Sequence, residues 1–504
     1  MRIAAIVPMS ALLAVAWQGR GSAEERRYSL VIGYNGAPAS GSGAPLRFAD
    51  DDALAFVELR RQLADETVLL TVPDSESRRR YPEAVERAQP PTIVALDRAM
   101  AQIGDALRAD RSAGRTTVFS FFYSGHGVRA ADGEATLTLL DEGLTRRMLF
   151  ERVIDRAPAD VIHLFIDACH AEAMVRSRDG DASANIVALS PDDIADSQRQ
   201  LGKHPNVGFI VASSSEGAAH EWDAYQSGVF THEVVSAMRG AADVNGDGRI
   251  EYSELGAFLS AANREVQDPR ARLHTIVRPP MSAPRSPLAD FSRARDVARL
   301  VRIPAAIESI SIEDAFGNHL AEGRPELGFF MTISLPANQQ LFIRRGDQEA
   351  GVVLRPGIDR EFRGLAFQER PSRPRGALES SMRAGLFLAQ FGPAYYRGYV
   401  DAQEVVPVPI AALPSLTVDT GTASPAPRRA FVPRAVLSGG ALACVATSLA
   451  FSGLAWQAWR DNRNATEQAS IDANHRYRTD VTLAGTFLVS GMLVAGVALL
   501  IGSD

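Results

Sequence analysis

Two short polar segments of the sequence carry side chains that can do covalent chemistry. The segment SGHG at 124–127 and the segment DACH at 167–170 each follow an apolar run. A thiol becomes a strong nucleophile as its thiolate, and a neighbouring imidazole lowers its pKa enough to form it. Glycines on both sides of His126 allow a tight turn that directs a main-chain N–H toward a substrate carbonyl. Cys169 and His126 are therefore candidates for a nucleophile and its base. The alternative is that Cys169 is a small residue that only packs in the core.

The elements that would position these segments alternate along residues 28–215. Residues 49–63 and 92–107 place apolar side chains at helical spacing. Five runs rich in β-branched and aromatic residues are typical of buried parallel strands; they span 28–33, 67–72, 117–123, 161–166 and 207–211. The alternation predicts an open, mostly parallel α/β sheet with helices on both faces. Ligands bind at the carboxyl ends of strands in such sheets, so both polar segments are expected at the same rim.

The two segments together resemble a known family. YSGHG followed about forty residues later by DACH is similar to the caspase and metacaspase proteases, in the broad bacterial caspase-like branch. The similarity extends from YSLVIG at 28–33 to SSSEGAAHEWDAYQSGVFTHEVVSAMRG at 213–240, and it covers residues 28 to about 290. The resemblance implies a caspase-like peptidase domain over residues 24–295.

The resemblance also implies roles for individual residues. Cys169 matches the nucleophile and His126 the general acid/base, while the backbone N–H groups of Gly127 and Cys169 would form the oxyanion hole. Peptide cleavage would run through a thioester and would require no metal or organic cofactor. His170 is not expected to be the base, because adjacent side chains leave a strand end in different directions. A homologue that only binds, as an inactive sensor or scaffold of the cell envelope, is the alternative.

Acidic residues near the nucleophile predict which side chain the substrate pocket accepts. In metacaspase-type members, acids line the pocket for the residue before the scissile bond; Asp52 and Asp167 occupy matching positions, and Ser124 matches a pocket-lining serine. Paired carboxylates in a partly desolvated pocket favour a guanidinium or ammonium group. The resemblance thus implies cleavage after Arg or Lys. The other interpretation of the acids at 50–52 is a helix N-terminus that complements the helix dipole.

The sequence after the nucleophile departs from the family. DACH continues as AEAM, where the family has Ser-Gly, so the preference beyond the basic residue stays open. The polar segment 171–206 lies where family members are often self-cleaved. It holds basic residues that an arginine-specific enzyme could cut, unless they belong only to a solvated loop: Arg176, Arg178, Arg199 and Lys203.

A further segment, DVNGDGRIEYSE at 243–254, fits the twelve-residue calcium loop of an EF-hand. Gly248 falls at the sharp turn and Ile250 at the position that points to the core. The ligand positions, with Arg249 contributing its carbonyl, hold Asp243, Asn245, Asp247, Arg249, Glu251 and Glu254. An acidic turn with no ion is the alternative. Because an exported site meets a high calcium concentration, a single loop of this kind is expected to hold calcium constantly as a structural ion and not to act in signalling.

The rest of the chain predicts a second domain and a linker. Residues 300–403 alternate apolar and polar side chains between Gly, Pro and Asn turns, which predicts a small β-rich domain. Residues 404–433 are rich in Pro, Ala and Thr, a composition typical of a semi-extended linker.

The termini predict an exported protein that is anchored in a membrane. Residues 1–23 combine an early Arg, an apolar run and small residues at 21–23, as in a cleaved signal peptide. The apolar segments 435–456 and 481–501 each reach the ~20 residues of a transmembrane helix, and the arginines of 457–480 fit a short loop between them. The alternatives are an uncleaved anchor or a first buried strand at the N-terminus, buried helices of a soluble domain in the two apolar segments, and a cytoplasmic location.

The composition argues against nucleic acid as a partner. The 504 residues carry a formal net charge of −7, without a basic patch interleaved with aromatic residues. Cys169 and Cys444 are the two cysteines of the sequence, so a disulfide framework is not expected. The expected partners are peptide or protein substrates with a basic residue before the scissile bond, and a membrane.

Overall fold

The computed structural model describes most of the chain up to residue 404. The described residues are 24–38, 44–129, 135–169, 171, 174, 203–213, 221–223, 225–266, 273–294, 296–305, 309–369 and 385–404. They all belong to the first of the two units into which the chain divides, Met1–Glu404. Several predictions fall outside them: the signal peptide 1–23, the linker beyond residue 404, both apolar segments 435–456 and 481–501 with their loop, His170, and the cleavage candidates Arg176, Arg178 and Arg199.

No helix in these described ranges is long and apolar enough to cross a membrane. Both predicted transmembrane segments lie outside these ranges, and they stay predictions from the sequence. Of the self-cleavage candidates, Lys203 is described, and its side chain is exposed.

The first half of the fold is a six-stranded sheet with the order β12-β8-β7-β3-β1-β2. Its strands are β1 (Glu25–Tyr34), β2 (Glu66–Thr71), β3 (Thr116–Gly125), β7 (Val161–Asp167), β8 (Val207–Ser213) and β12 (His274–Arg278). The first five run parallel, and β12 pairs antiparallel with β8. The predicted open, mostly parallel sheet is confirmed, with an antiparallel edge strand that the sequence pattern did not predict.

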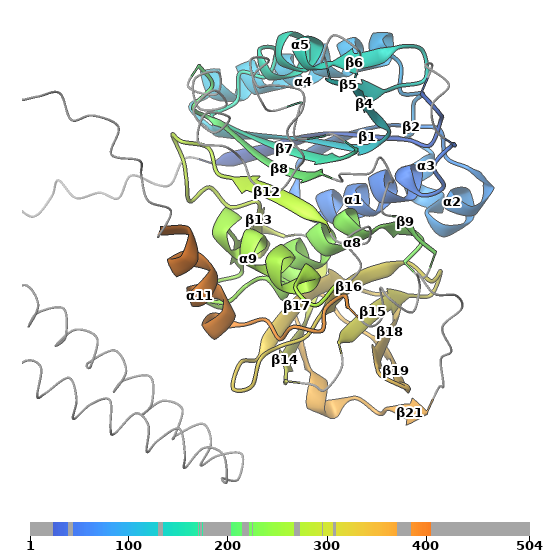
Figure 1. Ribbon diagram of the computed structural model, residues 1–504, viewed down its shortest axis with the longest axis vertical. Coiled ribbons are helices and arrows are strands. Elements are labelled where there is room, and N and C mark those ends of the chain that lie inside the picture. The colour runs from blue at the N-terminus through green and yellow to red at the C-terminus, as the bar shows by residue number, and fades with distance from the viewer. Residues whose placement is uncertain are drawn as a thin grey trace, which may run out of the picture. The chain divides into compact units, whose positions relative to one another are not determined.

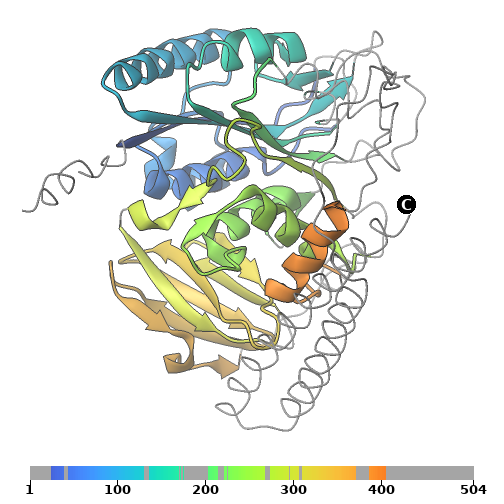
Figure 2. The ribbon, with the colours of Figure 1, turned by 90° about the vertical axis from the view of Figure 1, so that its left-hand side faces the viewer.

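Helices cover both faces of this sheet (Figures 1 and 2). On one face lies α4 (Ile93–Ser112), whose Leu96, Met100 and Ile103 share a hydrophobic cluster with the β3 residue Phe121. The opposite face packs against α1 (Ala49–Leu63), α8 (Val229–Ser236) and α9 (Tyr252–Asn263). A sheet that is buried on both faces requires strands that are mostly apolar, as the five runs are.

Shorter elements complete this half. They are α2 (Ser75–Arg80), α3 (Pro82–Val85), β4 (Gly127–Arg129), β5 (Ala135–Thr138), β6 (Gly143–Thr145), α5 (Arg146–Met148), η1 (Leu149–Ile154), β9 (Glu221–Trp222), β10 (Ser227–Gly228), η2 (Ala237–Ala241), β11 (Arg249–Ile250), β13 (Ala289–Asp290) and η3 (Phe291–Arg293). Strands β4, β5 and β6 form a small sheet directly after the SGHG turn.

The second half is β-rich, as the alternating pattern predicts. One sheet contains β14 (Val297–Ile303), β17 (Met331–Pro336) and β20 (Asp359–Glu361); the other contains β15 (Ile310–Asp314), β16 (His319–Gly323), β18 (Gln340–Arg345), β19 (Gln348–Val353) and β21 (Gln368–Glu369). The turn η4 (Phe362–Gly364) lies between β20 and β21, and the helix α11 (Pro393–Glu404) comes after β21.

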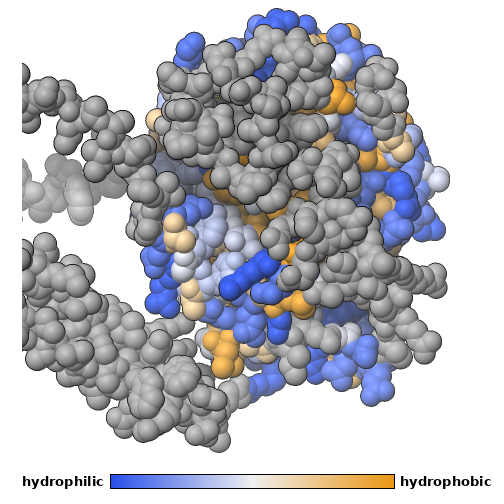
Figure 3. All heavy atoms as spheres, viewed as in Figure 1, coloured by the Kyte–Doolittle hydropathy of each residue, from blue (hydrophilic) through white to orange (hydrophobic). Residues whose placement is uncertain are grey.

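The β-rich half does not have a core of its own. Ile333 of β17 and Ile343 of β18 belong to the same hydrophobic cluster as Phe230 of α8 and Phe258 of α9. Most of the buried apolar residues of the β-rich half belong to this cluster. On the face of the molecule in Figure 3, the coloured surface is mostly hydrophilic, with separate apolar patches. The two halves are therefore packed together through one continuous core.

Candidate active site

The SGHG turn lies directly against the DACH segment. Strands β3 and β7 are neighbours in which Ser124 pairs with Asp167, so both segments leave the same rim of the sheet. A Cβ on Gly127 would lie 1.9 Å from the carbonyl oxygen of Cys169. Only glycine fits at this contact. The structure thus places side by side the two residues, Gly127 and Cys169, whose N–H groups are predicted to hold an oxyanion.

The imidazole of His126 is oriented by the backbone. Its Nε2 lies 2.9 Å from the carbonyl oxygen of Ala44. Because a carbonyl only accepts, Nε2 carries the proton in the neutral ring, and Nδ1 is left as the basic nitrogen. Burial lowers the pKa of His126, and the bond to Ala44 partly opposes this. The ring is therefore largely neutral at pH 7 and able to take up a proton.

Cys169 is buried, two residues beyond the end of β7. A turn follows it, in which the N–H of Ala171 donates to the carbonyl of Ala168 at 3.2 Å. Cys169 is thus buried, as a packing residue would be, and it also lies at the rim of the sheet, where a nucleophile is expected.

Asp52, Ser124 and Asp167 come together beside this rim. The Asp52 carboxylate accepts hydrogen bonds from Ser124 Oγ at 2.7 Å, from Ser227 Oγ at 2.5 Å and from the N–H of Gly228 at 2.8 Å. Asp167 accepts from Thr231 Oγ1 at 2.7 Å. The three residues predicted to line the substrate pocket are therefore neighbours in space.

The two carboxylates approach the same point. A Cβ on Gly228 would lie 2.7 Å from Asp167 Oδ2 and 2.8 Å from Asp52 Oδ2. Burial raises the pKa of Asp52 well above its usual range, and the negative charge of Asp167 raises it further. Burial also raises the pKa of Asp167, to about 6, against the hydrogen bonds from Thr231. The pair therefore resists carrying two negative charges, and a cation between them would relieve that repulsion.

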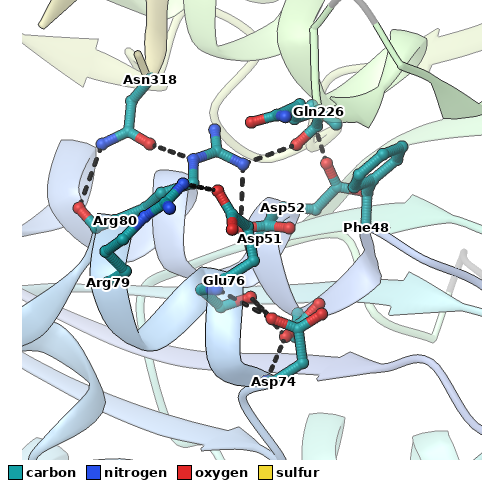
Figure 4. A network of polar contacts seen from close by, with 12 residues as sticks. Phe48, Asp51, Asp52, Asp74, Glu76, Arg79, Arg80, Gln226 and Asn318 are labelled. Atoms are coloured by element: carbon teal, nitrogen blue, oxygen red, sulfur yellow. Dashed lines mark hydrogen bonds and ion pairs between the residues drawn. The ribbon is translucent and has the colours of Figure 1, made fainter. Parts of the chain in front are cut away.

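The neighbouring acids at 50 and 51 have a different role. Asp51 pairs with the buried Arg80 of α2, with 3.2 Å between Oδ1 and Nη1. Figure 4 shows Arg80 between Asp51, the carbonyl of Gln226 and the side chain of Asn318, whose Oδ1 accepts from Arg80 Nε at 2.8 Å. Asp50 accepts from Ser77 Oγ and from the N–H of Asp74. Of the three acids in the first turn of α1, Asp52 lies beside Ser124 and Asp167, and the other two bind α2 and the segment before it.

Four residues of the site were not predicted from the sequence. Ser227, Gly228 and Thr231 hold the two carboxylates from the segment 225–231. Glu221 accepts from the N–H groups of Arg47 and Phe48 at 2.9 and 2.7 Å, and so caps α1 where Phe48 offers no side-chain acceptor. The sequence signal available for Ser227, Gly228 and Thr231 was weak. These small or hydroxyl-bearing residues lie at the start of an apolar helix.

A family model described as Caspase domain matches residues 26–283. The chain belongs to the caspase-domain family. It has the fold of a cysteine peptidase, and peptidases of this family require no cofactor for catalysis. All residues of the site, from Asp52 to Thr231, lie within the matched region.

Two solved structures are similar to this member of the caspase family. The crystal structure of caspase-1 from Spodoptera frugiperda is 12% identical, with 51% of this chain and 86% of that chain covered and a TM-score of 0.28. A structure of pro-sf-caspase-1 is also 12% identical, with 42% and 69% covered and a TM-score of 0.22. At these scores, neither likeness adds to the argument. No curated protein matches the chain.

The calcium loop has the turns of the motif without a metal cluster. Asp243 accepts from the N–H groups of Gly246 and Gly248 at 2.7 and 2.9 Å, and both glycines have φ of +74°. Glu254 accepts from the N–H of Glu251, and burial, with Asp243 and Asp247 nearby, raises the pKa of Glu254 to about 8. In the part of the chain that the structure describes, no group of three or more His, Cys, Asp and Glu side chains is placed to hold a metal ion. Calcium binding stays a prediction from the sequence.

Proposed function

We propose that this caspase-family member is a cysteine endopeptidase that cleaves peptide bonds after Arg or Lys. The observation that carries the proposal is the pair of buried carboxylates, Asp52 and Asp167, that meet at Gly228. Aspartate before the scissile bond would add a negative charge beside a pair of carboxyl groups that already resists carrying two. A guanidinium or ammonium group instead neutralises the pair and takes up the acceptors that the pocket offers.

The proposed chemistry uses Cys169 and His126. Nδ1 of His126 removes the thiol proton, and the sulfur attacks the carbonyl carbon of the scissile bond. The resulting oxyanion is held by the N–H groups of Gly127 and Cys169. His126 then gives the proton to the leaving amine as the C–N bond breaks, and a thioester remains. Water, deprotonated by the same Nδ1, hydrolyses the thioester and releases the new carboxylate.

A panel of fluorogenic peptides tests this function on the full-length chain. We expect hydrolysis after Arg and Lys, none after Asp, and loss of all turnover in Cys169→Ala. His126→Ala and His170→Ala, compared separately, assign the base: the first is expected to abolish turnover and the second to retain it. Preferred hydrolysis after Asp would contradict the specificity, and activity in Cys169→Ala would contradict the mechanism.

The tether to the cell envelope is proposed from the sequence alone. It rests on the apolar segments 435–456 and 481–501 and on residues 1–23. Membranes of cells that express the chain are to be washed with alkaline carbonate, and intact spheroplasts treated with protease. We expect the chain to stay with the membrane and the peptidase domain to be digested. Release by carbonate, or protection from protease, would contradict the tether or its orientation.

A further inference from the structure

A row of polar side chains is buried on the face of the sheet that α1 covers. Ser29 of β1, Ser120 of β3 and His163 of β7 pair with one another across the three adjacent strands. In-register residues of parallel strands point to the same face. All three side chains are fully buried. This row lies in the middle of a sheet that is otherwise apolar.

Two arginines reach this row. Arg60 of α1 is fully buried and donates from Nε to Ser29 Oγ at 3.0 Å. Arg27 of β1 is 4% exposed and lies two residues before Ser29, so it points to the same face. Their Nη1 atoms approach the adjacent carbonyls of Leu288 and Pro287, at 3.4 and 3.3 Å. The two guanidinium groups are therefore close neighbours.

The positive charge of this pair is only half compensated. Arg27 Nε pairs with Glu25 at 2.7 Å. For Arg60, no carboxylate of the described residues comes within 4.0 Å. Burial and, to a smaller extent, the positive charge of Arg27 together lower the pKa of Arg60 to about 9, without an acid that opposes this. Arg27 and Arg60 also lower the pKa of His163, after the larger effect of its burial, so its ring is neutral. One buried positive charge remains.

Hydrogen-bond donors accompany this charge. Buried polar atoms that have no partner among the residues described here include Arg27 Nη2, Arg60 Nη2, Ser120 Oγ and His163 Nε2. The other ring nitrogen of His163 lies 2.7 Å from the hydroxyl of Tyr252, and when that hydroxyl donates, Nε2 carries a proton. Native proteins leave few buried donors without an acceptor, and here four accompany one uncompensated charge.

We propose that these four groups bind one small monovalent inorganic anion, such as chloride. A single negative charge neutralises the remaining positive charge and accepts from all four donors. A water molecule would accept the hydrogen bonds but leave Arg60 charged and unpaired in the core. The anion fixes the last turns of α1 to the sheet. Asp52 is in the first turn of the same helix. The anion therefore helps to hold Asp52 in place without being part of the proposed substrate pocket.

Thermal unfolding of the full-length chain tests this site. The melting temperature is measured over a series of sodium chloride concentrations, with sodium gluconate at matched ionic strength as the large-anion control. We expect a rise that only chloride produces; above its Kd, each tenfold increase in free chloride raises the folding equilibrium constant about tenfold. Arg60→Met is expected to abolish this response. Arg61→Met is the matched control, since Arg61 is exposed and pairs with Glu58 and Glu83, and it should keep the response.

Crystals of the wild-type chain grown in sodium bromide give an independent readout. An anomalous peak beside Arg60 Nη2 and Ser120 Oγ would support the site. Water in that position, or equal chloride responses of wild type and Arg60→Met, would overturn it. If Arg60→Met does not fold, Ser120→Ala removes one donor and is expected to raise the half-maximal chloride concentration severalfold; an unchanged value would also overturn the proposal.

Discussion

Replacing Asp52 with asparagine removes the negative charge that its carboxylate can carry beside a basic substrate side chain, while its contacts can be kept. The asparagine carbonyl can accept from Ser227 Oγ and from the N–H of Gly228, as Asp52 Oδ1 does at 2.5 and 2.8 Å. Its amide nitrogen would face Ser124 Oγ, which accepts as readily as it donates. We therefore expect Asp52→Asn to fold, so that its effect on turnover reports the charge.

The size of that effect follows from the burial of the carboxylate. Removing one member of a buried, hydrogen-bonded charge pair costs about 2–5 kcal/mol, and each 1.36 kcal/mol is tenfold in rate. Asp167 remains, so part of the attraction for a basic side chain persists. We expect kcat/KM for an arginyl peptide to fall by roughly 30-fold to several thousand-fold.

The assay compares each arginyl peptide with its citrulline analogue, a neutral group of nearly the same shape. Wild type should prefer arginine strongly, and Asp52→Asn should lose most of that preference. Alkylation of Cys169 by iodoacetamide should stay near the wild-type rate, because the nucleophile is untouched. Asp50→Asn is the matched control on the same helical turn: its amide nitrogen must face either Asn35 Nδ2 or the donors of Asp74 and Ser77, so it should lower the melting temperature and keep the preference. An unchanged arginine preference in Asp52→Asn would refute the pocket assignment.

Three further predictions concern pH, positioning and metal. Burial raises the pKa of Asp167 to about 6, so KM for arginyl substrates should fall as pH rises through about 6. The folded state holds this proton more tightly than the unfolded state does. The free energy of unfolding should therefore decrease between about pH 4 and pH 6. A pH-independent KM would contradict this. Asn318→Ala removes the acceptor of Arg80 Nε and loosens the contact of Arg80 with the carbonyl of Gln226, next to Ser227. KM should therefore rise a few-fold while kcat stays nearly constant. An equal loss in kcat would argue against a role of Asn318 in positioning alone. Calorimetry with Ca²⁺ should show weaker binding for Glu254→Gln, and equal affinity would count against the loop as a site.

The strands of the sheet could be predicted because burial on both faces leaves a direct trace in the sequence. The five apolar runs coincide with β1, β2, β3, β7 and β8. The edge strand β12 was missed, because a short antiparallel strand on the edge has no such trace. The alternation within 300–403 predicted the β-rich region. It did not predict that this region packs against α8 and α9, because an apolar face does not specify what covers it.

The site was predictable where residue type and strand ends coincide. Asp52, Ser124 and Asp167 were found through the family resemblance, and the structure brings them together. Gly228 and Thr231 could not be placed, because their position depends on how the chain returns to the rim after residue 213. The fixation of His126 by the carbonyl of Ala44 was also hidden, since a backbone acceptor has no sequence signature.

Covalent labelling with peptidyl inhibitors tests nucleophile and specificity in one measurement. The full-length chain is incubated with an acyloxymethyl ketone that carries Arg before the reactive group, or with the Asp counterpart, and the labelled residue is mapped by mass spectrometry. We predict that the arginyl probe modifies Cys169 and that the aspartyl probe does not. Labelling by the aspartyl probe alone, or no labelling of Cys169 by the arginyl probe, would contradict an Arg/Lys-specific cysteine endopeptidase.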